Sequence, residues 1–174
     1  MKPFLLALAI LVVLIVAIVV IGALLPKHHV AQRTAAFNAT SEQVFRLISG
    51  PQDWRTDLSE YKFYDDAGRH MISETDKRGQ RITYEVVESQ SPTSFRRAIA
   101  DKNLPFGGTW TWSIEAHHGG CAVKIEEDGD VYNPVFRFVS RLLIGHTRTI
   151  DNYLAMLANA VKQRNAGVPS SMAR

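Results

Sequence analysis

The chain has 174 residues, a formal net charge of +3, and a composition of 46% hydrophobic and 21% charged residues. This length suits one domain with a short additional segment, and so weak a charge does not indicate a nucleic-acid partner. Abundant aromatic and β-branched residues exclude a disordered chain, and the single cysteine, Cys121, excludes a disulfide scaffold.

The first predicted element is a membrane-spanning helix over residues 4–25, a run without any charged or hydrogen-bonding side chain. At ~1.5 Å per residue this helix is about 33 Å long, close to the roughly 30 Å hydrocarbon core of a bilayer. We therefore expect residues 1–27 to form an uncleaved single-pass anchor, with the lipid bilayer as a partner through residues 4–25. The alternatives are a cleaved signal peptide and a buried core helix. The flanking basic residues leave open on which side of the membrane the domain lies.

Residues 28–164 are predicted to form one α+β domain, followed by a flexible tail over residues 165–174. The domain begins with a strand predicted over residues 26–38, which includes the β-branched Val30.

Two short helices are predicted after this strand. The run Thr40-Ser41-Glu42-Gln43 has the pattern of a capping box, in which the side chains of the first and last residues each accept from the other's backbone amide. Gly50 and Pro51 end this helix. Residues 52–58 are predicted to form a second helical turn that is anchored by Trp54.

Between residues 61 and 132 the sequence predicts about six antiparallel strands separated by polar, glycine-containing turns. The clearest alternation places Trp110, Trp112 and Ile114 on one face of a strand. Three other segments repeat the pattern: Ile82, Tyr84 and Val86; Phe95, Arg97 and Ile99; and Cys121, Val123 and Ile125. One face of the sheet is therefore expected to be mainly apolar, and the other solvated.

The last predicted element is one long helix over residues 134–163. Asn133 is a good N-cap and Pro134 suits the first helical position. Apolar residues and one histidine then recur at steps of three or four: Val135, Val139, Leu142, His146, Ile150, Tyr153, Leu157 and Val161. The basic residues Arg137, Arg141 and Arg148 are predicted to form a solvated face or, alternatively, to contact anionic lipid headgroups.

This order of elements resembles the helix-grip fold of the SRPBCC superfamily over roughly residues 28–163. The superfamily includes START lipid-transfer domains, birch-pollen-allergen-like proteins and polyketide cyclase/dehydrase-like proteins. The similar residues are Ala39-Thr40-Ser41-Glu42-Gln43-Val44-Phe45, Gly50-Pro51-Gln52-Asp53-Trp54 and Phe106-Gly107-Gly108-Thr109-Trp110-Thr111-Trp112. A second tryptophan that often follows the Trp54 position is missing. The resemblance implies a curved antiparallel sheet wrapped around a long C-terminal helix.

The need to bury the apolar face of the sheet leads to a similar arrangement without reference to the resemblance. A sheet that is apolar on one face must cover that face, and the long helix is its only amphipathic partner. If the sheet curves away from the helix, a cavity remains that suits a hydrophobic or amphipathic small molecule, lipid-like or polyketide-like. The residues predicted to line it are Tyr84, Phe95, Arg97, Trp110, Trp112, Val123, Ile125, Glu127, Phe138, Leu142 and His146.

The aromatic candidates each have a second interpretation. Trp110 and Trp112 form either a wall against the ligand or ordinary core packing, and Tyr84 either orients a ligand oxygen or is a half-buried strand tyrosine.

The interpretation of the charged candidates depends on which face of the sheet their side chains lie on. An inward Arg97 needs a carboxylate or a ligand anion, and Glu127 is a possible partner. Alternatively both lie near strand ends and reach water, or a bulge at Asp128-Gly129 reverses the facing. His146 either donates a hydrogen bond to the ligand or is a satisfied core histidine.

We expect no metal site and no cofactor, because the sequence contains neither metal-ligand spacing nor a phosphate-binding glycine loop. The leading hypothesis is a membrane-anchored domain that binds a hydrophobic small molecule. The alternatives are a cyclase/dehydratase- or hydrolase-type enzyme, with Tyr84, Arg97, Glu127 or His146 as acid–base groups, and a non-catalytic protein-interaction module. The sequence does not identify the ligand, the protein partners or the oligomeric state.

Overall fold

A computed structural model describes residues 2–145 and 147–167 of the chain. The elements in chain order are α1 (Lys2–Leu24), β1 (His28–Phe37), α2 (Ser41–Ser49), β2 (Leu58–Asp66), β3 (Arg69–Asp76), β4 (Arg81–Gln90), β5 (Ser94–Ile99), β6 (Phe106–His117), β7 (Gly120–Val131), α3 (Pro134–Val139), a π-helical turn (Ser140–Ile144) and α4 (Arg148–Asn165). The predicted tail over residues 165–174 lies mostly outside the described residues.

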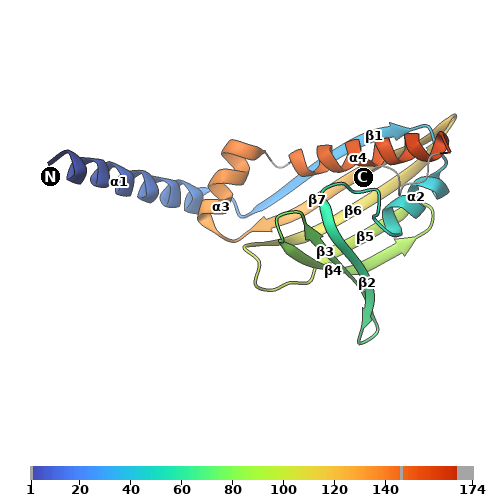
Figure 1. The fold of residues 1–174 in the computed structure, drawn as a ribbon, viewed down its shortest axis with the longest axis horizontal. Coiled ribbons are helices and arrows are strands. Elements are labelled where there is room, and N and C mark those ends of the chain that lie inside the picture. The colour runs from blue at the N-terminus through green and yellow to red at the C-terminus, as the bar shows by residue number, and fades with distance from the viewer. Residues whose placement is uncertain (1, 146, 168–174) are drawn as a thin grey trace.

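The strands of the described residues form one antiparallel sheet in the order β1-β7-β6-β5-β4-β3-β2. The sheet curves, and α4 runs along it above β7 and β6 (Figure 1). This is the α+β helix-grip architecture. The six predicted strands between residues 61 and 132 are confirmed as β2 to β7.

The core lies between the apolar face of this sheet and the helices α2 and α4. The predicted alternation is confirmed, because Trp112 and Ile114 of β6 are buried and Trp110 packs against the same core. From α4, the side chains of Ile150 and Leu157 are completely buried against this face. Strand β7 keeps its pairing with β6 in register through Asp128 and Gly129, so the sheet has no bulge there.

The capping box of α2 is confirmed: the Thr40 hydroxyl accepts from the Gln43 amide at 3.3 Å, and the Gln43 side chain accepts from the Thr40 amide at 2.9 Å. The second predicted helix, over residues 52–58, is wrong, because this segment consists of turns. The Gln52 side chain donates to the carbonyls of Leu47 and Ile48 and thereby terminates α2. The Trp54 indole also donates to the Leu47 carbonyl, so side chains instead of a helix hold this segment.

The prediction of one continuous helix over residues 134–163 is also wrong. Residues Pro134–Ile144 form α3 and a π-helical turn, and α4 begins only at Arg148. Gly145 has φ +80°, a conformation that favours glycine, and its amide donates to the Ser140 carbonyl at 2.8 Å. The apolar residues on the two sides of the break have different surroundings: Val135 and Leu142 are exposed, whereas Ile150 and Leu157 are buried in the core.

Helix α1 projects away from the domain and contacts α3 near its C-terminal end (Figure 1). Within α1, Pro3–Leu24 is long and apolar enough to cross a membrane, and its side chains are not buried in the domain. The expected solvated position of Arg137 is incorrect, since this side chain is buried. Its guanidinium donates to the carbonyls of Leu25 and Tyr132, both at 3.0 Å.

Candidate ligand-binding cavity

A cavity of ≈ 420 Å³ lies between the sheet and the first half of α4. Its lining residues are Arg55, Asp57, Glu74, Tyr84, Arg97, Trp110, Thr149, Asn152, Tyr153, Ala155 and Met156. The sheet contributes one residue each from β3, β4, β5 and β6, because inward-facing positions on neighbouring strands lie side by side. The remaining residues come from α4 and from the loop before β2.

Three charged side chains form the polar part of this cavity. Glu74 accepts one hydrogen bond from Arg97, and the Arg55 Nη1 donates to both of its carboxylate oxygens at 3.1 Å. Arg55 also forms a two-point contact with Asp57, at 3.0 and 2.5 Å. The side chains of Arg55, Glu74 and Arg97 are only 9%, 7% and 6% exposed, so this is a buried ion network.

The network fixes the protonation of its members. Burial alone would raise the pKa of Glu74, but the charges of Arg97 and Arg55 outweigh it and hold the pKa below the ordinary value. Burial works against the charge of Arg97 as well, and the adjacent Glu74 carboxylate more than compensates, so the pKa of Arg97 is raised. Both groups are therefore ionised at neutral pH.

Aromatic rings enclose the charged groups. The Arg97 guanidinium carbon lies 4.0 Å from the centre of the Tyr84 ring, and that of Arg55 lies 5.4 Å from the Tyr153 ring. Tyr153 also contacts Trp110, with ring centroids 6.1 Å apart. Burial raises the pKa of Tyr84 to about 12, so its hydroxyl is neutral. The cavity thus combines aromatic walls with fixed charges.

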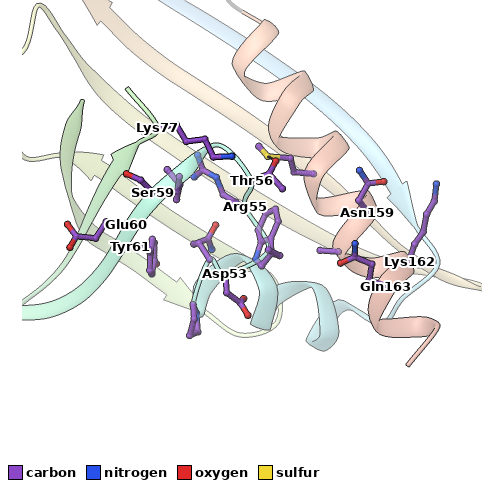
Figure 2. A pocket seen from close by; sticks show the side chains of 16 residues that line it. Asp53, Arg55, Thr56, Ser59, Glu60, Tyr61, Lys77, Asn159, Lys162 and Gln163 are labelled. Carbon is purple, nitrogen blue, oxygen red and sulfur yellow. Dashed lines mark hydrogen bonds between the residues drawn. The ribbon is translucent and has the colours of Figure 1, made fainter. Parts of the chain in front are cut away.

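A larger hollow of ≈ 850 Å³ adjoins this cavity and shares Arg55 and Met156 with it. Figure 2 shows its lining, with Asn159 and Gln163 on α4 at one side and residues of β2, including Tyr61, at the other. Since the two spaces share lining residues, Arg55 and Met156 lie at the boundary between the cavity and the outer hollow.

Three of the predicted lining residues, Tyr84, Arg97 and Trp110, do line the cavity. Four others pack in the hydrophobic core and do not line it: Phe95, Trp112, Val123 and Ile125. For Trp110 the structure supports a wall position, and for Trp112 it supports core packing.

The suggested pairing of Arg97 with Glu127 is incorrect, because Glu74 is the partner and Arg97 does not reach water. Glu127 lies opposite Trp110 in the sheet and contacts His29 at 3.4 Å. Phe138 and Leu142 precede the helix break and line neither this cavity nor the adjoining hollow. The predicted site residue His146 lies outside the described residues.

Sequence reasoning missed Glu74, Arg55 and Asp57. Glu74 follows the buried Ile72 at a spacing of two, so the alternation of β3 contained a signal for an inward carboxylate. Arg55 and Asp57 lie in a loop, where no periodicity predicts facing. In the part of the chain that the structure describes, His, Cys, Asp and Glu form no group of three or more that could hold a metal ion.

A family model described as "Polyketide cyclase / dehydrase and lipid transport" matches residues 28–162. The chain belongs to this family. Members of the polyketide cyclase/dehydrase and lipid transport family are SRPBCC-type proteins, so the match agrees with the helix-grip architecture and with a ligand-binding domain.

Solved structures of the same fold include norcoclaurine synthase from Thalictrum flavum, with a TM-score of 0.61 and 12% identity over 79% of this chain and 96% of that one. A protein from Mesorhizobium loti has a TM-score of 0.60 and 13% identity over 78% and 98% of the two chains. One from Chromobacterium violaceum has a TM-score of 0.54 and 17% identity over 76% and 96%. No curated protein matches the chain. At such identities the neighbours show the fold of this polyketide cyclase/dehydrase family member and nothing of its ligand.

Proposed function

We propose that this protein is a single-pass membrane protein whose domain, residues 28–164, binds an amphipathic small molecule between the sheet and α4. The observation that carries this proposal is the buried network of Arg55, Glu74 and Arg97 in the wall of an otherwise aromatic cavity. Burying charges is unfavourable unless each is paired, and ligand pockets use a few fixed polar groups to orient the ligand.

The arginines of the network are donors at the wall of the cavity. Glu74 already accepts from both of them, and the Nε of Arg97 is fully buried without a hydrogen-bond partner within the described residues. A ligand carboxylate or carbonyl oxygen would accept from an arginine N–H group that borders the cavity. The ligand's apolar part then lies along Trp110, Tyr153 and Met156.

The protonation states favour binding over proton transfer. Glu74 is held ionised, and the neighbouring tyrosine hydroxyls are held neutral because burial raises their pKa. A general acid–base catalyst needs a pKa near the working pH. These groups therefore suit fixed recognition of a polar headgroup.

The N-terminal helix supports a membrane location for this binding. Its 22 apolar residues from Pro3 to Leu24 fit the span of a bilayer, and an 18-residue window within them contains no buried residue. Residues 1–27 are accordingly proposed as the anchor. An anchor holds the cavity within a short distance of the bilayer, which raises the encounter rate with membrane-soluble ligands.

The test is native mass spectrometry of the full chain released from mild detergent, with dodecanoate and methyl dodecanoate as probes. We expect one bound dodecanoate and weaker binding of the ester, because the ester lacks the charge that pairs with arginine. Met156→Trp, which narrows the cavity, should abolish binding, whereas the control Val87→Trp, at an exposed position on β4, should not. Equal binding to both variants would refute a ligand site at this cavity.

A further inference from the structure

The segment formed by α3 and the π-helical turn, residues 134–144, has an unusual surface, and we name it the juxtamembrane segment. Large apolar side chains on it are exposed: Val135, Phe136, Leu142 and Leu143, at 41%, 51%, 55% and 71%. The sequence from Asp130 to Asp151 contains no other acidic residue, whereas its arginines Arg141 and Arg148 are exposed. Exposed apolar groups combined with basic charge are typical of interfacial membrane helices.

The juxtamembrane segment is held tightly against the end of α1. A Cβ atom added at Gly22 would lie 2.0 Å from the Pro134 carbonyl oxygen, so the two backbones meet where only glycine fits. Arg137 donates to the carbonyls of Leu25 at 3.0 Å and Ala23 at 3.5 Å. It thereby neutralises the negative end of the α1 dipole. The segment therefore cannot shift independently of α1.

This attachment sets the level of the segment relative to a bilayer. Figure 1 shows α3 crossing the C-terminal end of α1 transversely, at the point where the chain enters the domain. If α1 spans the hydrocarbon core, a helix that crosses its end lies along the membrane surface. The apolar side chains of the juxtamembrane segment then continue the exposed apolar surface of α1. That surface ends at Leu24.

We propose that the juxtamembrane segment is a second membrane-contacting element, which inserts Phe136, Leu142 and Leu143 into the headgroup region of the bilayer. This inference rests on the proposed membrane anchor and not on the ligand. Lipid is the occupant that the surface fits, because the patch continues the lipid-facing helix and because the exposed Arg141 complements phosphate groups. The domain is then docked on the membrane in one orientation. The start of α4, which lines the cavity, follows directly after this contact.

The test uses variants of the full chain that each carry one added cysteine, in nanodiscs of phosphatidylcholine and phosphatidylglycerol, labelled with a nitrobenzoxadiazole fluorophore. The native Cys121 is completely buried and does not compete for the label. The probe position is Leu143→Cys, and its matched control is Phe63→Cys, an exposed apolar residue of β2. Strand β2 is at the opposite edge of the sheet from β1, the strand that follows α1, so this control position is separated from the proposed anchor. Val12→Cys, in the middle of α1, reports on the anchor itself.

We expect lipids with brominated acyl chains to reduce the emission at positions 143 and 12 by about twofold or more, and to leave position 63 unchanged. Quenching at position 12 alone overturns this inference and leaves the anchor intact. Quenching at neither position overturns the anchor as well. Protection of position 143 from aqueous iodide without quenching by brominated lipid indicates a second protein copy on the patch, which also overturns the inference. Leu142→Cys repeats the measurement if the label at 143 perturbs folding.

Discussion

Arg97 on β5 donates a hydrogen bond to Glu74 on β3, across the intervening strand β4. The guanidinium passes over the ring of Tyr84, which is the inward residue of β4 between them. The same carboxylate also accepts two hydrogen bonds from Arg55 in the loop before β2. One acidic side chain therefore connects the sheet to the loop at the border of the cavity.

Removing this carboxylate should be strongly destabilising. Glu74→Gln leaves two arginines buried without their shared counter-charge, and we expect a loss of about 3–5 kcal/mol in the free energy of unfolding. The measurement is urea denaturation of the full chain in detergent, followed by tryptophan fluorescence. The matched control Glu126→Gln removes an acid whose side chain is 40% exposed and pairs with Lys124, and it should lose less than about 1 kcal/mol. A similar loss for both variants would contradict the buried network.

The two partners should also show strong coupling. Replacing both residues, as Glu74→Leu with Arg97→Met, removes the charges of this pair together and leaves Arg55 paired with Asp57. We expect the double variant to be less destabilised than the sum of the two single variants, because each single change leaves its partner uncompensated. A double-mutant cycle on unfolding free energies measures this coupling, and strict additivity would argue against direct pairing.

Acid should weaken the fold through Glu74. Its folded pKa lies below the ordinary 4.5, because the charges of Arg97 and Arg55 outweigh the effect of burial. The unfolded chain therefore takes up this proton first, so the stabilisation is complete above the ordinary pKa and is lost as the pH falls through the folded pKa. We expect the stability difference between the native chain and Glu74→Gln to shrink as the pH is lowered from about 7 to about 3. A constant difference would contradict the lowered pKa.

Alkali should also weaken the fold, through Tyr84, whose pKa is shifted upward. Burial raises its folded pKa from 10.0 to about 12, although Arg97 opposes the shift. The folded state then retains a proton that the unfolded state releases, so stability is lost as the pH rises from 10 towards 12. Tyr84→Phe should show a shallower decline over this range in pH-dependent urea denaturation. A decline as steep as that of the native chain would assign the effect to other groups.

The helix break at Gly145 should be sensitive to substitution. Gly145 has φ +80° and ψ 147°, a region almost restricted to glycine, and an added Cβ would meet no atom within 4 Å. Gly145→Ala should therefore lower the stability by about 1–3 kcal/mol through backbone strain alone. Thermal unfolding of the full chain in detergent measures this change. An unchanged midpoint would mean that the break does not require this conformation.

Much of the fold was predictable because its signals are local. The capping box at Thr40 and Gln43, and the alternation of Trp110, Trp112 and Ile114, each involve residues a few positions apart. The site was predictable only in part. Tyr84, Arg97 and Trp110 were found because they share the apolar face. Glu74 was overlooked, although its spacing from Ile72 placed it on that face.

The sequence by itself determined the apolar N-terminal helix and the one-sided strands, because hydrophobicity and period act within a single element, but it left the facing of Arg97 open. Only the tertiary structure decided which carboxylate meets Arg97 and where the C-terminal helix is broken. The first depends on strand order, which places β3, β4 and β5 side by side. The second is accompanied by the positive φ of Gly145 and by contact between α3 and the distant α1, where Gly22 meets Pro134. Contacts between segments that are distant in the chain leave no signal in a local pattern.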